Sequence, residues 1–187
     1  MRRPDKMELF DLGRDLIYRW CEMNQVDRPK IIIHPDGKPT FAVCAYYRDG
    51  AIYIWPHACA SIGMAGRSWS YPGYVVDRTP YGVLAHELAH HVEGAHGGRG
   101  GKIAKTWFVE TGESPITSYA PNVNEWFAEI FRLFLTNPDL LSILRPKMFK
   151  KLSGEWPRLI ERRVWKDVLK GAERQIRAAE NKIRQVT

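Results

Sequence analysis

The stretch LAHELAHHVEGAH, residues 84–96, carries four histidines and two glutamates in thirteen positions. Within it, His86, Glu87 and His90 spell H-E-x-x-H. Side chains four residues apart project from one face of a helix, so the two imidazoles can bind one zinc ion with Glu87 beside the same opening. A catalytic zinc site has three protein ligands and keeps one position open for water. The motif therefore predicts a zinc site whose third ligand lies elsewhere in the sequence.

The residues around the motif predict a helix that is buried along one side. Thr79-Pro80 is typical of a helix start, with threonine as the N-cap and proline at the first helical position. We expect this helix to end near Gly94. The apolar residues that would hold it against a core are Val83, Leu84, Leu88 and Val92. The alternative is an ordinary helix in which the histidines only pack and Glu87 is a solvated charge.

His96 is one candidate for the third ligand, because it occupies the last position of the metzincin pattern H-E-x-x-H-x-x-G-x-x-H. That pattern requires glycine where this chain has Glu93, and Gly94 comes one residue too late. A metzincin-like site closed by His96 therefore stands as an alternative only. His91 points about 100° away from His90 around the helix, so we expect a core or surface histidine there and no metal ligand.

A second candidate for the third ligand lies in ITSYAPNVNEWFAEIFRLF, residues 116–134. Glu125 and Glu129 are four apart on one face of a predicted helix from Val123 to about Leu135. One of them can ligate zinc while the other accepts a hydrogen bond from a ligating imidazole. From the residues alone an alternative is equally good, since Asn122 followed by Glu125 also forms a capping box.

Taken together, residues 80–140 resemble the gluzincin zinc metallopeptidases. The likeness is greatest to the catalytic domain of anthrax lethal factor and related phage and bacterial proteins. The shared features are the H-E-x-x-H helix, a Thr-Ser-Tyr segment at 117–119, and Asn-Glu-x-Phe-Ala-Glu at 124–129 running into Phe-Arg-Leu at 131–133. The resemblance implies a zincin-like fold and a Zn²⁺ cofactor.

The resemblance also assigns roles to individual residues. It implies that His86, His90 and Glu125 bind zinc and that Glu129 hydrogen-bonds to a ligating histidine. Glu87 would be the general base, and Tyr119 would stabilise the transition state. We therefore expect a zinc-dependent metallopeptidase that hydrolyses a polypeptide substrate with a metal-activated water. The connection between Tyr119 and the following helix is shorter here than in the family.

The remaining patterns indicate an α+β fold with a small, mainly antiparallel sheet. Two roles fit the strand at 51–55 equally well: its exposed edge can pair with an extended substrate, or it is a plain structural strand. The elements predicted outside the two motif helices are an amphipathic helix over 5–24, a strand over 30–34, a hairpin of strands 41–47 and 51–55 around Arg48-Asp49-Gly50, and a long C-terminal helix from about Pro157.

Composition and charge predict one soluble domain with a basic extension. The 187 residues are 44% hydrophobic and 26% charged, which is ordinary for a globular protein. Residues 145–187 hold 13 Lys/Arg and 5 Asp/Glu, while the other 15 basic and 16 acidic residues nearly cancel. We expect a metallopeptidase domain over 1–145 and a basic helical extension over 146–187 packed on the same domain.

The basic extension supports a second hypothesis on function. A binding module on a metallopeptidase scaffold would use residues 145–187 to contact nucleic acid or an acidic protein partner, whereas the favoured alternative is a solvated basic face without a partner. Three cysteines without a C-x-x-C pair argue against a disulfide framework. No signal peptide or membrane-spanning run is evident, so we expect a cytoplasmic protein without a membrane partner.

Overall fold

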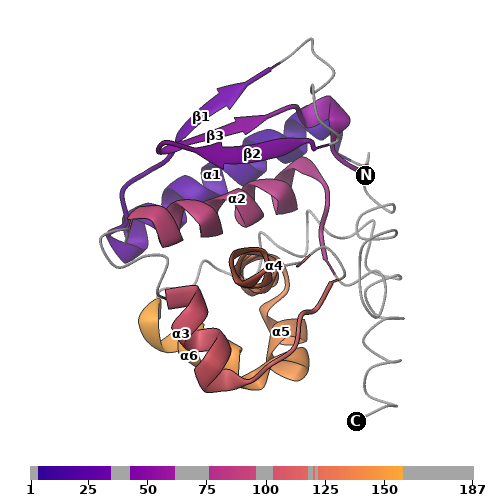
Figure 1. Cartoon of the computed structure of the whole chain (residues 1–187). Helices are drawn as coiled ribbons and strands as arrows, with labels where there is room; N and C mark the ends of the chain where they lie inside the picture. Colours follow the sequence, from indigo (N-terminus) through magenta and orange to yellow (C-terminus); the bar gives the residue numbers. More distant parts are fainter. Residues whose placement is uncertain are drawn as a thin grey trace.

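The protein is seen here as a computed structural model that describes residues 4–34, 43–61, 76–95, 103–117, 120 and 122–157. A small sheet covers one side of a set of helices, so the α+β class is confirmed (Figure 1). The elements in chain order are α1 (Lys6–Asn24), β1 (Lys30–Ile33), β2 (Ala45–Arg48), β3 (Ala51–Ile54), the 3-10 helix η1 (Pro56–Ala58), α2 (Pro80–Ala95), α3 (Ile103–Thr111), α4 (Val123–Thr136), α5 (Pro138–Leu144) and α6 (Pro146–Glu155).

The three described strands are ordered β1-β3-β2, with β3 in the centre. β2 pairs antiparallel with β3, as predicted for the hairpin, but β1 pairs parallel with β3. The prediction of a mainly antiparallel sheet is therefore wrong, and the sheet is mixed. Because β3 is hydrogen-bonded on both sides, the prediction that residues 51–55 offer a free edge is wrong too. The edge strand next to β3 on the hairpin side is β2.

A two-residue turn joins β2 to β3 and confirms the predicted hairpin. Asp49 and Gly50 both have positive φ, at 49° and 80°. This is the pattern of a type I′ turn, whose twist matches the twist of the flanking strands. The turn fixes the register at Arg48 opposite Ala51. Ile52 and Ile54 of β3 then point into the core.

Helices α1 and α2 cross at close range beneath the sheet. A side-chain carbon added to Gly13 of α1 would lie 2.9 Å from the Cα of Tyr81 in α2, so only glycine fits at this crossing. The start of α1 is fixed by Asp5, whose side chain accepts hydrogen bonds from the backbone of Met7 and Glu8. The α2 helix begins as predicted, with the Thr79 carbonyl accepting from the Val83 amide.

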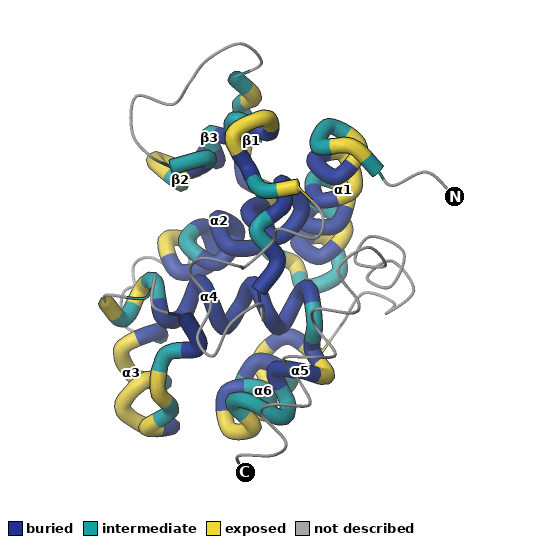
Figure 2. The backbone as a smooth tube through the Cα atoms, turned by 90° about the vertical axis from the view of Figure 1, so that its right-hand side faces the viewer, coloured by how far each residue is buried: buried dark blue, intermediate teal, exposed yellow. Residues whose placement is uncertain are grey.

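Helix α4 runs through the middle of the helical part, between α2 above it and α3, α5 and α6 below (Figure 1). Its residues from Trp126 to Thr136 are all buried, and Figure 2 shows most of this helix in dark blue. Two of those buried residues are charged, Glu129 and Arg132. Buried charges require partners, and the partners of Glu129 lie at the junction of α2 and α4.

Helices α3, α5 and α6 were not predicted from the sequence. Pro138 and Pro146 look like helix breakers, but both lie in the first turn of a helix, where proline fits. Trp156, just beyond α6, packs in the main core with its ring 5.6 Å from those of both Trp20 and Phe131. Residues 146–157 therefore share the core of residues 1–145.

The predicted long C-terminal helix from about Pro157 lies outside the described residues. So do residues 158–187, which hold nine of the 13 Lys/Arg of the basic segment on which the nucleic-acid hypothesis depends. Among the helices that are described, none is long and apolar enough to cross a membrane.

Candidate metal centre

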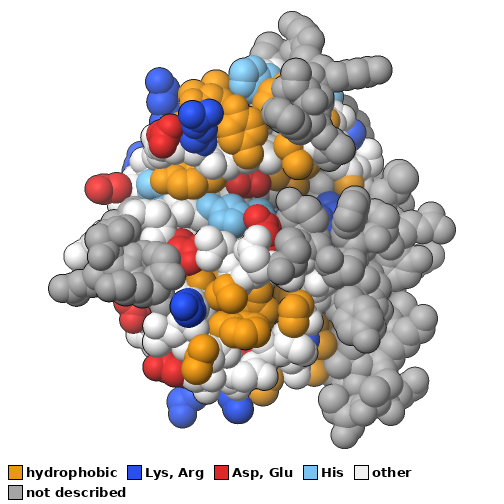
Figure 3. All heavy atoms as spheres, viewed as in Figure 1, with side chains coloured by type: hydrophobic (Ala, Val, Ile, Leu, Met, Phe, Trp, Pro, Cys, Tyr) orange, Lys and Arg blue, Asp and Glu red, His pale blue; other side chains and the backbone are white. Residues whose placement is uncertain are grey.

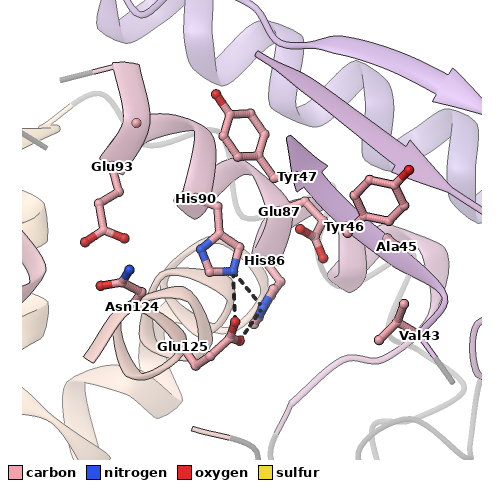
Figure 4. Close-up of a pocket in the computed structure, with 11 residues that line it drawn as sticks. Val43, Ala45, Tyr46, Tyr47, His86, Glu87, His90, Glu93, Asn124 and Glu125 are labelled. Carbon is pink, nitrogen blue, oxygen red and sulfur yellow. Dashed lines mark hydrogen bonds and ion pairs between the residues drawn. The ribbon is translucent and has the colours of Figure 1, made fainter. Parts of the chain in front are cut away.

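Helices α2 and α4 bring together His86, His90 and Glu125. The Nε2 atoms of the two histidines lie 3.3 Å apart. The Glu125 carboxylate reaches both, with Oε2 3.1 Å from Nε2 of His86 and Oε1 3.5 Å from Nε2 of His90. Figure 4 shows the three side chains converging on one point at the floor of a cleft. Among the described residues, no other group of three or more His, Cys, Asp or Glu side chains lies close enough together to hold a metal ion.

The side chain of Glu125 takes part in this cluster while its backbone amide takes part in the N-cap of α4. The Asn122 side chain caps α4 by accepting hydrogen bonds of 3.0 Å from the amides of Asn124 and Glu125. The Glu125 carboxylate is turned toward the imidazoles of α2 at the same time. Only the Asn122 half of the predicted capping box is therefore present, because the Glu125 side chain that would complete the box contacts the two imidazoles instead.

Glu129 lies on the side of His86 that faces away from the cluster and determines which ring nitrogen carries the proton. Nδ1 of His86 lies 2.7 Å from Oε1 of Glu129. A carboxylate only accepts hydrogen bonds, so Nδ1 carries a proton and donates it. In neutral His86 the lone pair is therefore on Nε2, which faces His90 and Glu125. Orientation of a ligating imidazole by a carboxylate behind it is a common feature of zinc sites.

The distances at this point match the edges of a zinc coordination shell. Zinc–nitrogen and zinc–oxygen bonds of about 2.0–2.1 Å in a tetrahedron place neighbouring ligand atoms about 3.3 Å apart. The two imidazole nitrogens are separated by 3.3 Å, and each has one of the two Glu125 oxygens near it, Oε2 at 3.1 Å from His86 and Oε1 at 3.5 Å from His90. Two imidazole nitrogens and a carboxylate oxygen are also ligands that zinc prefers. The donor set and its spacing therefore fit zinc.

Glu129 is fully buried and is held by two arginines as well as by His86. Nη2 of Arg132 lies 2.6 Å from Oε1, and Nη2 of Arg78 lies 3.4 Å from Oε2. Burial disfavours the charged carboxylate, but Arg132 and the His86 contact outweigh it and lower the pKa of Glu129 to about 2. The carboxylate therefore stays ionised and able to accept the proton of His86.

In the metal-free chain the same contacts perturb the other titrating groups. Burial and Arg132 lower the pKa of His86. Hydrogen bonds to Glu125 and Glu129 raise it by more than these two effects lower it, so the net shift is upward. The pKa of Glu125 is raised by burial yet falls well below its usual range because both histidines hydrogen-bond to the carboxylate. Without a metal, the two carboxylates therefore favour the protonated form of His86.

Glu87 lies beside the three ligands and lines the same cleft. Its side chain is 6% exposed, and burial raises its pKa against the opposing effects of His86 and His90. A carboxyl group whose pKa is raised above its usual value is a better base and is suited to accept and return a proton. Figure 4 shows the carboxylate next to the histidines on the side of β2.

The cleft has a volume of about 440 Å³ and lies between the sheet and α4. Figure 3 shows histidine and acidic side chains at the surface between the sheet-bearing upper part and the helical lower part. The residues that line the cleft are Val43, Ala45, Tyr46, Tyr47, His86, Glu87, His90, Glu93, Gly94, Asn124 and Glu125. The wall opposite the ligands is thus supplied by edge strand β2.

Among the histidines beyond the cluster, His91 has a packing role, as predicted. Its side chain is buried, and its Nε2 donates to the Asp27 carbonyl at 2.7 Å. Its Nδ1 lies 3.4 Å from the Tyr47 hydroxyl. Two other predicted site residues, Tyr119 and His96, lie outside the described residues.

Several residues at the site were missed in the sequence. Arg132 carried a usable signal, because it follows Glu129 by three residues on the same buried face. Arg78, Tyr46 and Tyr47 come from segments far from α4 in the sequence, and no local pattern connects them to the motif. Asn124 is adjacent to a predicted ligand but was considered only as part of the resemblance.

No family model, curated protein or solved structure matches this chain. The functional interpretation therefore depends on the geometry and chemistry of the cluster itself.

Proposed function

We propose that this chain is a zinc-dependent metallopeptidase with a zincin-like fold of gluzincin type. The observation that carries the proposal is the convergence of His86, His90 and Glu125 at zinc-like spacing, with Glu129 fixing the proton of His86. A closed structural site would need a fourth protein ligand. Among the described residues the cluster has three, and it borders an open cleft, which favours catalysis over a purely structural role.

The chain's own residues account for the acid–base part of peptide hydrolysis. When bound, zinc supplies a Lewis acid that polarises a carbonyl and lowers the pKa of water toward about 7. Glu87 then takes the proton of the attacking water and delivers it to the leaving amine. Glu129 keeps the proton of His86 on Nδ1, so that the lone pair of Nε2 faces the cleft. Tyr119 remains the candidate to donate a hydrogen bond to the developing oxyanion.

The edge strand beside the ligands supports a polypeptide as the substrate. Ala45, Tyr46 and Tyr47 of β2 line the cleft, while the other edge of β2 is paired with β3. An extended peptide that adds to the outer edge of β2 would receive main-chain hydrogen bonds along the cleft. Its backbone would then pass the three ligands, which is the position required for hydrolysis of an amide bond.

The test is cleavage of a mixed peptide library by the zinc-loaded protein, followed by mass spectrometry of the products. We expect cleavage by the wild type and a loss of about 10²- to 10⁴-fold in kcat/KM for Glu87→Gln. Bound zinc, measured in parallel, should be unchanged in Glu87→Gln because that residue is not a ligand. Absence of cleavage by zinc-loaded wild type, or full activity in Glu87→Gln, would refute the proposal.

A further inference from the structure

Glu93 is a buried carboxylate in the cleft that the hydrolytic mechanism does not use. It follows His90 by one turn of α2 and is 6% exposed. Figure 4 shows its carboxylate turned toward the carboxamide of Asn124, on the other side of His90 from Glu87. Both Glu93 and Asn124 line the cleft, so they form one end of it, beyond the metal ligands.

Among the described residues, no cationic side chain forms an ion pair with the Glu93 carboxylate, and burial raises its pKa. Its Oε1 atom is buried, and within the described ranges no hydrogen-bond donor reaches it. Glu129, on the neighbouring helix, shows how this chain treats a buried carboxylate that has a structural role, since His86, Arg78 and Arg132 all contact it. A buried carboxylate without such partners is costly to ionise unless a ligand supplies a positive charge.

The position of Glu93 limits where that positive charge can be on a bound peptide. Side chains three residues apart on a helix have their Cβ atoms about 5–6 Å apart, so Glu93 lies close to the ligand His90. An extended peptide advances about 3.3 Å per residue. A substrate group that reaches Glu93 therefore belongs to a residue within about two positions of the bond at the metal ligands.

We infer that Glu93 selects polypeptides that carry a cationic nitrogen within about two residues of the cleaved bond. The inference rests on the proposed peptidase function and adds the substrate class. An ammonium or guanidinium group would be held by a charge-assisted hydrogen bond to the carboxylate, with Asn124 beside it. The same chemistry is offered by a lysine or arginine side chain and by the free α-amino group of a peptide.

The test uses pairs of peptides cut by the zinc-loaded protein, in which lysine is exchanged for norleucine at each position near the cleaved bond. Each pair is made with a free and with an acetylated N-terminus, which separates a side-chain ammonium from an α-ammonium group. We expect about a tenfold higher kcat/KM for the cationic member. Dissociation constants measured on Glu87→Gln should show the same preference without turnover.

Three variants test whether the preference for the cationic peptide is due to Glu93. In Glu93→Gln, which keeps the shape and removes the charge, the ratio should fall to about one, whereas Glu93→Asp should retain part of it. Glu110→Gln, which removes an exposed carboxylate of α3, should keep the wild-type ratio. Zinc content and the unfolding midpoint of each variant establish that it is folded.

The outcomes separate this inference from the proposed function. Cleavage of both members of every pair at equal rates, or a preference that survives in Glu93→Gln, overturns the role of Glu93 and leaves the peptidase function intact. Failure of the zinc-loaded wild type to cut any peptide overturns the peptidase function, and the selection by Glu93 is overturned with it.

Discussion

The Nδ1 atom of His86 lies 2.7 Å from Oε1 of Glu129, and this contact joins the proposed metal site to the centre of the protein. Glu129 is fully buried on α4 and is also contacted by Arg132 and Arg78. The carbonyl of Asp77, just before α2, accepts a hydrogen bond from Arg132 at 3.3 Å. The start of α2, the middle of α4 and the imidazole of His86 are therefore held by one polar network.

Replacement of Glu129 by glutamine should weaken both the metal site and the fold. The neutral amide removes the negative charge that contacts buried Arg132 and half-buried Arg78, so we expect a loss of about 3–5 kcal/mol in the free energy of unfolding. Loss of the carboxylate behind His86 should weaken zinc binding about 10- to 100-fold. Chemical denaturation and zinc titration against a chelator measure the two effects.

The control for this variant is Glu110→Gln, which removes a carboxylate from an exposed pair with Lys151. An exposed ion pair contributes at most about 1 kcal/mol, so this variant should be close to wild type in both measurements. Equal effects of Glu129→Gln and Glu110→Gln would show that the buried network does not support the site.

The metal-free protein should lose stability as the pH rises above neutrality. The pKa of His86 is raised above its usual 6.5 in the folded state, so its stabilising contribution is complete below pH 6.5 and is lost as the pH passes the folded-state pKa. Glu125 and Glu129 have pKa values below their usual 4.5, so their contributions are present above pH 4.5 and are lost in acid. The three contributions coincide between about pH 4.5 and 6.5.

Urea denaturation of the chelator-treated protein at pH 6 and pH 8 measures this dependence. We expect a lower free energy of unfolding at pH 8, and a smaller difference between the two values in His86→Gln. In excess zinc the trend should reverse, because zinc competes with protons for the same nitrogen. An unchanged difference in His86→Gln would contradict the assignment to His86.

The close crossing of α1 and α2 predicts an unequal response to glycine substitution. Gly13→Ala places a methyl group 2.9 Å from the Cα of Tyr81, and we expect about 1–3 kcal/mol of destabilisation from overpacking. Gly154→Ala in α6 is the matched control. A methyl group there meets nothing within 4 Å, and alanine is favoured over glycine in helices by about 1 kcal/mol. Thermal unfolding of the two variants should shift in opposite directions, and destabilisation by both would contradict this account of the crossing.

Local patterns in the sequence were sufficient for much of the fold. The 3.6-residue spacing and the end signals located α1, α2 and α4, and the Asp49-Gly50 pair located the hairpin. The failures concern information that is not local. The parallel pairing of β1 with β3 depends on how the chain returns to the sheet, and neither strand encodes it. Pro138 follows the end of α4 and begins α5, and no local pattern distinguishes a proline that only ends a helix from one that also begins the next.

For the candidate site, too, local patterns predicted some residues and tertiary structure supplied the others. The four-residue spacings within HELAH and within EWFAE place two residues of each helix on one face, so the partners on each helix could be predicted. That these faces meet depends on the packing of α2 against α4, which the family resemblance supplied and the residues alone did not. Arg78 and the tyrosines of β2 reach the site only through tertiary structure.

The most direct test of the central claim is the zinc stoichiometry and affinity of the metal-depleted protein, compared among the wild type, Glu125→Gln and His96→Ala. The wild type should bind one zinc ion per chain. Glu125→Gln should bind it at least about 100-fold more weakly through the loss of an anionic ligand, while His96→Ala should match the wild type. Absence of zinc binding by the wild type, or zinc affinity that depends on His96 and not on Glu125, would contradict the claim that His86, His90 and Glu125 form the metal site.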